Sequence, residues 1–171
     1  QPMESIAVNG VCLTVVAARA GVFDVEMIPE TQRLTSLSSL RAGMRLNLEP
    51  SLGLTDRFNG HVVFGHVDGV GRVRSRRQIK GELILEIGIE RRLRAYLVPK
   101  GPIAVDGVSL TVGSVLTPAS FRIHLIPETL RRTTLAQRQP GDAVNIEIDY
   151  FAKLVRQAQR ANAAASFQAK R

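Results

Sequence analysis

Two side chains with the chemistry of nucleophiles stand at the same place in a duplicated motif. Residues 5–15 read Ser-Ile-Ala-Val-Asn-Gly-Val-Cys-Leu-Thr-Val and residues 102–112 read Pro-Ile-Ala-Val-Asp-Gly-Val-Ser-Leu-Thr-Val, so Cys12 aligns with Ser109. A thiol or a hydroxyl can act as a nucleophile when a neighbouring base activates it. Because the two residues exchange within an otherwise matched repeat, we predict that they share a polar role. The alternative for Cys12 is an ordinary buried thiol on an apolar strand.

The three histidines are the candidate acid–base groups, since imidazole changes its charge near neutral pH. His66 lies in Gly-His-Val-Asp-Gly, and this context favours a catalytic role. We interpret His61 as structural and His124 as a satisfied or exposed residue of a strand. The spacing of these histidines and Cys12 matches no zinc pattern, so we expect no metal site.

The motif belongs to a longer internal repeat. The Ile-Pro-Glu-Thr block at residues 28–31 recurs at residues 126–129, and Gly43, Asn47 and Glu49 recur 98 positions later as Gly141, Asn145 and Glu147. A period near a hundred residues is too long for a solenoid and fits a duplicated small domain. We therefore predict one domain in residues 1–57, a second in 58–149 and a helix in 150–171. The first copy has few residues ahead of its motif, so we expect it to be truncated at its N-terminus.

The elements that position these residues are short strands. Apolar or alternating runs at residues 13–16, 22–27, 45–49 and 82–87 are separated by Gly, Asn, Asp or Pro. This spacing is typical of an all-β chain of small antiparallel barrels or sandwiches. Asn9-Gly10 and Asp106-Gly107 predict tight hairpins, because both residue types tolerate positive φ. Each Pro-Glu-Thr block predicts a helical turn or an irregular connection.

Apolar residues near the end of the chain have a different spacing from those in the predicted strands. Phe151, Leu154, Val155 and Ala158 recur at helical spacing, with basic residues between them. This pattern predicts one amphipathic helix outside both β domains. Its apolar stripe can be buried against another subunit or back on its own barrel.

Composition excludes several classes of protein. Hydrophobic residues make up 44%, no apolar run is long enough to span a membrane and no basic-then-apolar leader is present, so we expect no membrane partner and a cytoplasmic location. The net charge of +8 could attract nucleic acid. With only 5% aromatics, a platform for stacking single-stranded bases is poorly supported, and we interpret the basic runs as solvated faces.

Two further blocks complete a resemblance to a known family. Together with Asn-Gly-His-Val-Val-Phe-Gly-His-Val-Asp-Gly at residues 59–69 and with Lys100-Gly101, the paired motifs resemble the riboflavin synthase alpha chain family. The resemblance implies tandem six-stranded Greek-key barrels, the first one truncated here, and a C-terminal helix that helps to hold a homotrimer. It implies an enzyme that dismutates two molecules of 6,7-dimethyl-8-ribityllumazine to riboflavin and 5-amino-6-ribitylaminopyrimidinedione, without a cofactor. Lumazine synthase is a further candidate partner.

The resemblance also implies site residues. One lumazine would lie in the first barrel of one subunit and face another in the second barrel of a neighbour. The implied catalytic residues are His66, Ser109, Cys12, Asp149 and Lys100. The implied substrate contacts are Ser5, Thr14, Thr111, the main chain beside Ile28 and Ile126, and the side chains of Glu30, Thr31, Glu128 and Thr129. A surface, β-propensity or a helix start explains many of these polar residues equally well.

Two other functions stay open at this point. A non-catalytic lumazine or flavin carrier of the same fold would not need His66, Ser109, Thr111 and Asp149 together, and all four are present. A basic barrel that binds nucleic acid would show steep salt dependence. One residue departs from the family, because Phe64 stands where the family usually carries a small hydroxyl residue.

Overall fold

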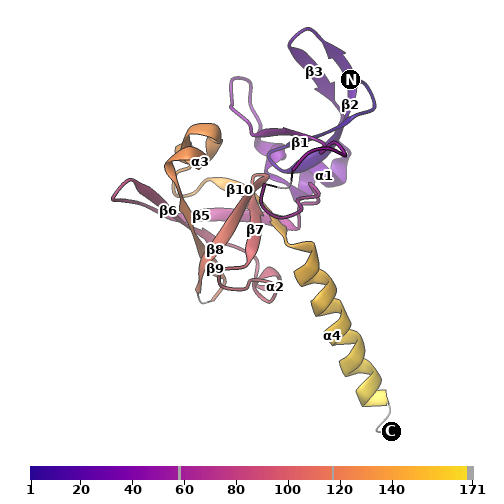
Figure 1. Ribbon diagram of the computed structural model, residues 1–171, viewed down its shortest axis with the longest axis vertical. Coiled ribbons are helices and arrows are strands. Elements are labelled where there is room, and N and C mark those ends of the chain that lie inside the picture. The colour runs from indigo at the N-terminus through magenta and orange to yellow at the C-terminus, as the bar shows by residue number, and fades with distance from the viewer. Residues whose placement is uncertain (58, 117, 169–171) are drawn as a thin grey trace.

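The computed structural model describes residues 1–57, 59–116 and 118–168, and it contains two β units followed by one long helix (Figure 1). The second unit is a closed six-stranded barrel with the order β10-β5-β6-β9-β8-β7. Its strands are β5 (Gly69–Ile79), β6 (Glu82–Gly88), β7 (Pro102–Val105), β8 (Val108–Leu116), β9 (Ser120–Leu125) and β10 (Ala143–Ile148), and all neighbours are antiparallel. The predicted six-stranded second barrel is confirmed.

The barrel closes around an apolar interior that follows strand alternation. Leu83, Leu85 and Ile87 of β6 point inward with 0% exposure, and Leu85 and Ile87 pair with Ile123 and Phe121 of β9. Short helices cover two connections: α2 (Arg91–Arg94) follows β6, and α3 (Pro127–Arg132) with the 3-10 helix η2 (Thr134–Gln137) joins β9 to β10. Side chains alternate across a strand, so every second residue enters the core.

The first unit is an open sheet of four strands, which corrects the expectation of a barrel. The strands are β1 (Ser5–Val8), β2 (Val11–Arg19), β3 (Val22–Val25) and β4 (Leu48–Pro50), in the order β3-β2-β1-β4. They correspond to β7, β8, β9 and β10, whereas β5 and β6 have no counterpart in residues 1–57. Without those two strands β3 and β4 remain edges of the sheet. The buried core is accordingly small and consists of Val8, Val11, Leu13 and Leu37.

The local predictions agree well with the structure. Asn9, Gly10, Asp106 and Gly107 all have positive φ, between 44° and 79°, in the two predicted hairpins. The Pro-Glu-Thr blocks form α1 (Pro29–Leu34), followed by the 3-10 helix η1 (Ser36–Ser39), and α3, each started by proline. The strand predicted at residues 45–49 is displaced, since pairing with β1 covers only Leu48–Pro50.

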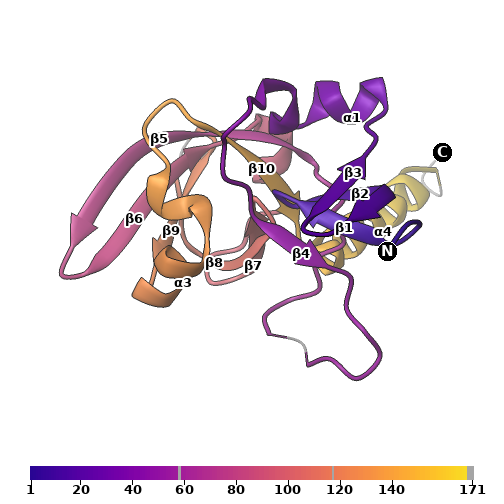
Figure 2. The ribbon, with the colours of Figure 1, turned by 90° about the horizontal axis from the view of Figure 1, so that it is seen from above.

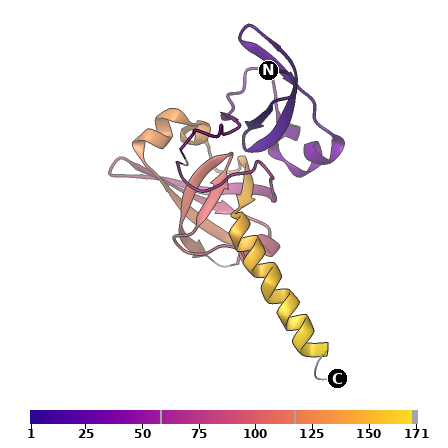
Figure 3. The same cartoon turned by 45° about the vertical axis from the view of Figure 1, so that its right-hand side comes forward.

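The C-terminal helix α4 (Tyr150–Gln168) leaves the barrel at the end of β10 and projects away from both β units (Figures 1 and 3). The side chain of Asp149 accepts a hydrogen bond from Ala152 N at 3.3 Å and caps the helix start. Among the described residues, no helix combines the length and the hydropathy that a membrane span requires.

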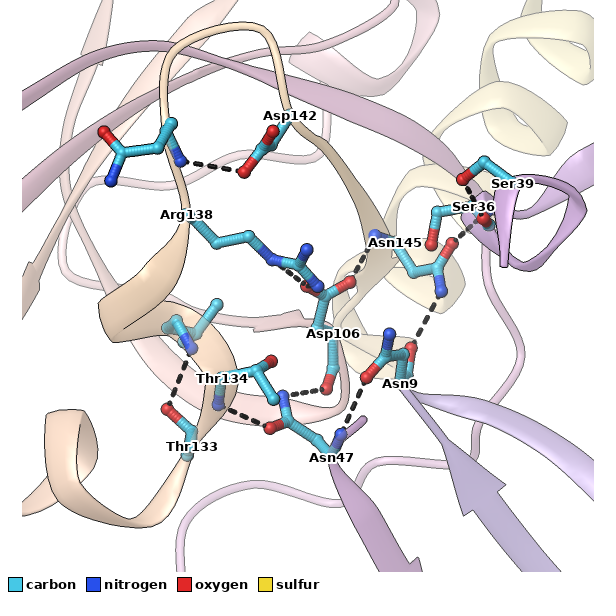
Figure 4. Close-up of polar contacts among 12 residues, drawn as sticks. Asn9, Ser36, Ser39, Asn47, Asp106, Thr133, Thr134, Arg138, Asp142 and Asn145 are labelled. Carbon is cyan, nitrogen blue, oxygen red and sulfur yellow. Dashed lines mark hydrogen bonds and ion pairs between the residues drawn. The ribbon is translucent and has the colours of Figure 1, made fainter. Parts of the chain in front are cut away.

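The two units meet through a polar contact with local two-fold character (Figure 4). The side-chain nitrogen of Asn47 donates to Asp106 O at 3.0 Å, and its repeat equivalent Asn145 donates to Asn9 O at 2.9 Å. The side-chain oxygens of the same two asparagines accept from Thr134 N at 2.8 Å and from Ser36 N at 2.7 Å, which are again equivalent positions. Seen from above, the strands of the first unit lie beside β10 (Figure 2).

Two glycines allow this approach. A Cβ atom on Gly10 would lie 2.4 Å from Gly107 N, and one on Gly107 would lie 2.8 Å from Gly10 N. Both distances are shorter than any packed side chain tolerates, so the repeat motif itself brings the units into contact.

Candidate functional site

A pocket of about 570 Å³ opens between the two units, on the side of the hairpins. Ser5 and Cys12 line it from the first unit, and Ser109 lines it from the second. The segment that connects β4 to β5, called the connecting segment below, supplies a third wall that includes His61 and Phe64. The pocket therefore joins the two positions, Cys12 and Ser109, that the repeat makes equivalent.

His61 and Ser109 form the closest pair of reactive groups in this pocket. His61 Nδ1 lies 2.8 Å from Ser109 Oγ, and the backbone N–H of His61 donates to the same oxygen at 3.2 Å. Burial lowers the pKa of His61, and Asp149 partly opposes this by its negative charge. A neutral imidazole with Nδ1 as acceptor carries its hydrogen on Nε2, and that atom is buried without a hydrogen-bond partner within the described part of the chain.

Cys12 presents an exposed thiol at the other end of the pocket, so it is not the buried thiol of the alternative interpretation. The backbone N–H of Cys12 donates to Gly65 O at 2.9 Å. Gly65 has a φ of 75°, and a Cβ atom there would lie 2.7 Å from the Cβ of Cys12. Only glycine fits this close approach, which fixes the connecting segment against β2.

Glu147 holds the same segment from the other side. Its two carboxylate oxygens accept the N–H groups of Phe64 at 2.8 Å and Gly65 at 2.9 Å. Burial raises the pKa of Glu147, while these two N–H donors act in the opposite direction. The carboxylate thus anchors a segment that reaches from the barrel to Cys12 of the first unit.

An aromatic group stands beside this anchor. The ring of Phe64 lies nearly parallel to that of His66, with centroids 6.0 Å apart and 17° between the planes. Tyr150, the first residue of α4, meets the Phe64 ring at 5.3 Å and 58°. Phe64 lines the pocket, and His66 is exposed and does not line it.

The structure brings only part of the predicted catalytic set together. Cys12, Ser109 and the predicted contact Ser5 share the pocket, and Asp149 is close enough to affect the pKa of His61. His66 and Lys100 do not line it, and the same holds for the predicted contacts Thr14 and Thr111. Thr14 pairs with Ser5 across β1 and β2, and Thr111 pairs with Pro102 across β7 and β8. Lys100 has a φ of 63°, and its N–H donates to Val112 O at 2.7 Å.

The predicted contacts in the Pro-Glu-Thr blocks lie away from the pocket. The carbonyls of Ile28 and Ile126 accept hydrogen bonds that start α1 and α3. The Glu128 carboxylate pairs with Arg131 and Arg132, which lowers its pKa, whereas Glu30 is exposed in the equivalent helix. Thr31 O and Thr129 O each accept from the hydroxyl of the threonine four residues later. The backbone carbonyls of these blocks and the Glu128 side chain therefore satisfy local structure.

From the sequence, the Gly-His-Val-Asp-Gly context favours His66 as the catalytic residue and His61 is interpreted as structural, whereas the structure places His61 in the pocket. The dipeptide Gly-His occurs at both positions and does not by itself show which histidine reaches the pocket. The contact between His61 and Ser109 joins residues 48 positions apart and exists only after folding. Across the described residues, no three His, Cys, Asp or Glu side chains gather in a way that would hold a metal ion.

Comparison with known proteins gives consistent matches. The family model described as the lumazine binding domain matches residues 2–51 and 64–149. The riboflavin synthase of Brucella abortus (strain 2308) is 43% identical over 154 residues, which cover 87% of this chain and 76% of that protein. The riboflavin synthase of Bacillus subtilis (strain 168) is 41% identical over 150 residues, which cover 88% of this chain and 69% of that protein.

Solved structures share the fold. A crystal structure of LumP complexed with riboflavin superposes with a TM-score of 0.78 at 25% identity, over 86% of this chain and 79% of that one. A second crystal structure of LumP, complexed with 6,7-dimethyl-8-(1'-D-ribityl) lumazine, gives a TM-score of 0.77 at 22% identity, over 86% of this chain and 78% of that one.

Proposed function

The chain belongs to the riboflavin synthase family, which is built from lumazine-binding domains, and from this premise we propose that the pocket between its two units is part of a reaction site that a neighbouring subunit completes. The reaction is the dismutation of two molecules of 6,7-dimethyl-8-ribityllumazine to riboflavin and 5-amino-6-ribitylaminopyrimidinedione. One observation carries this assignment. Cys12 and Ser109, the repeat-equivalent nucleophiles, line a single pocket of about 570 Å³, which is within the usual range for small-molecule sites.

The reaction consumes two copies of one molecule, and a duplicated fold offers two related surfaces to hold them. The matched polar contacts of Asn47 and Asn145 across the interface support descent of both units from one lumazine-binding Greek-key barrel. We assign the first unit to residues 1–57, the second to 58–149 and the oligomer helix to 150–171. Holding two large reactants in register supplies much of the rate of such a reaction.

The geometry of His61 and Ser109 gives the pocket its acid–base chemistry. The lowered pKa keeps the His61 imidazole neutral near pH 7, so its Nδ1 can accept the proton of the Ser109 hydroxyl. The Ser109 oxygen, or a water that it polarises, then adds to an electron-poor ring carbon of the bound lumazine. The exposed Cys12 thiol faces the same space from the first unit.

Turnover tests this proposal directly. The chain is incubated with 6,7-dimethyl-8-ribityllumazine, and the absorbance of riboflavin is followed. We expect riboflavin to form, and we expect Ser109→Ala and His61→Ala to lower kcat by about a hundredfold, in line with typical acid–base contributions, with a smaller change in KM. His124→Ala is the matched control, because His124 lies on β9 and pairs with Glu82 outside the pocket. Equal kcat in all four proteins would rule out the assignment.

A carrier of the same fold is the second candidate. The observation in its favour is the similarity to LumP, whose crystal structures contain lumazine or flavin ligands. Tight binding of lumazine without riboflavin formation would support the carrier. Binding of oligonucleotides with steep salt dependence, and no binding of lumazine, would contradict both functions.

A homotrimer is proposed on the basis of α4. Tyr150, Phe151, Leu154 and Val155 lie on one face of this projecting helix and are between 45% and 67% exposed. Such an apolar face is typically buried against another copy. Light scattering after gel filtration is expected to give a trimer, and Leu154→Arg with Val155→Arg is expected to give a monomer. Ala163→Arg, on the other side of the helix, serves as the control.

A further inference from the structure

The aromatic ring of Phe64 is exposed at the pocket and lies outside the apolar core of either unit. The Phe64 side chain is 46% exposed, whereas burial of a phenylalanine side chain in a core normally stabilises a protein. The position therefore forgoes the stabilisation that a buried aromatic residue would give.

The backbone at Phe64 is held more firmly than its exposure suggests. Its N–H donates to Glu147 Oε1 at 2.8 Å, and the next N–H, of Gly65, donates to Glu147 Oε2 at 2.9 Å. The carbonyl of Gly65 accepts from Cys12 N at 2.9 Å. Three hydrogen bonds to two different units fix the point from which the ring projects.

The ring itself is oriented by two neighbours. His66 stacks on it at 17°, and Tyr150 meets it at 58°. Phe64 lines the pocket together with His61 and Ser109, and His66 does not. An apolar ring that two aromatic neighbours contact therefore shares the pocket with the polar groups of His61 and Ser109.

We propose that Phe64 is a stacking wall that positions the planar ring system of the ligand and selects planar heteroaromatic molecules. This inference rests on the proposed function and extends it, because it assigns the ring of the substrate to a particular wall. A planar ring stacked on Phe64 would lie in the same pocket as His61 and Ser109. His66, which does not line the pocket, contacts the Phe64 ring.

Binding of ring-only and ring-plus-chain ligands tests the wall. Riboflavin carries the ribityl chain, and lumichrome is the tricyclic ring without it. Their dissociation constants are measured by fluorescence titration with the parent, Phe64→Leu, Phe64→Tyr and the control Phe151→Leu. Phe151 is an aromatic residue that is 67% exposed on α4 and does not line the pocket.

We expect Phe64→Leu to weaken both ligands about tenfold, as loss of an aromatic stacking partner does. Phe64→Tyr and Phe151→Leu are expected to bind like the parent. Equal thermal unfolding midpoints would show that the variants are folded.

Three results would contradict the proposal that Phe64 is a stacking wall. Phe64→Leu could bind both ligands like the parent, or Phe151→Leu could weaken binding as much as Phe64→Leu does. If Phe64→Leu does not fold, weak binding by the folded Phe64→Tyr variant would contradict the stacking role. By contrast, a parent protein that binds neither ligand would overturn the proposed function itself, and the wall with it.

Discussion

The two β units carry the same motifs, yet only the second closes. In the second unit, six strands enclose an interior in which twelve apolar side chains, among them Leu85, Phe121 and Ile146, are at 0% exposure. In the first unit, four strands leave β3 and β4 as edges, and its buried residues retain a few per cent of exposure. The comparison shows that the repeat motif specifies a hairpin and an interface, whereas closure depends on two additional strands.

The interface itself is unequal in charge. Asp106 is fully buried, and its carboxylate accepts from Arg138 at 2.7 Å and from Asn145 N at 2.8 Å. The equivalent positions in the first unit are Asn9, which accepts from Asn47 N at 2.8 Å, and Leu40. Burial raises the pKa of Asp106, and Arg138 opposes that shift. One half of the contact is therefore ionic and the other is neutral.

The anchoring glutamates differ as well. Glu147 is 5% exposed and holds two N–H groups, whereas its repeat equivalent Glu49 is exposed at the pocket. The difference follows from the connecting segment, which passes over Glu147 on its way to Cys12.

The largest expected effect comes from the glycines at the contact. Gly10→Ala places a Cβ atom 2.4 Å from a backbone nitrogen that cannot move, so we expect a loss of about 4 kcal/mol in the free energy of unfolding. Gly21→Ala has the same φ of 75° with nothing within 4 Å, and it should cost about 1 kcal/mol. Urea unfolding of both variants measures the difference. Similar losses for the two variants would contradict the close approach.

Asp106→Ala should break the ionic half of the interface. It removes the partner of the Arg138 guanidinium, so we expect a loss of about 3 kcal/mol. Asn9→Ala at the equivalent place removes one neutral acceptor and should cost about 1 kcal/mol. Both residues have positive φ, 47° and 44°, so the backbone cost is matched. Equal losses in the free energy of unfolding would show that the charge of Asp106 does not contribute to stability.

The two glutamates give the next comparison. Glu147→Ala leaves the N–H groups of Phe64 and Gly65 without their acceptor, and we expect a loss of about 2 kcal/mol. Glu49→Ala should leave stability unchanged, since its carboxylate is exposed. Hydrogen exchange at Gly65 reports the effect locally, and it should be faster in Glu147→Ala alone. Unchanged exchange there would refute the anchor.

The smallest effect is a pH dependence. The pKa of Glu147 is raised on folding, so between its ordinary value of 4.5 and the raised value the native state binds more protons than the unfolded state. The free energy of unfolding therefore falls as pH rises through this window. Glu147→Gln should make this fall of the free energy of unfolding shallower. The remaining pH dependence is expected to come from Asp106, whose pKa is also raised. If Glu147→Gln does not alter the pH dependence of the free energy of unfolding, the raised pKa of Glu147 is contradicted.

Much of the local structure was predictable from residue types. Asn9-Gly10 and Asp106-Gly107 form the hairpins because both residue types accept positive φ, and the proline at the start of each Pro-Glu-Thr block begins a short helix. The helix from Tyr150 follows from its apolar spacing. Within the candidate site, Cys12, Ser5 and Ser109 were found through the repeat and the family resemblance.

The sequence by itself determined the duplication, the turns, the terminal helix and the pair Cys12 and Ser109, because these depend on neighbouring residues or on direct alignment. Only the tertiary structure decided that Cys12 and Ser109 share one pocket and that His61 and not His66 touches Ser109. The physical reason is distance along the chain. Each of these features joins residues that lie far apart along the chain, and such long-range contacts leave no periodic signal in the sequence.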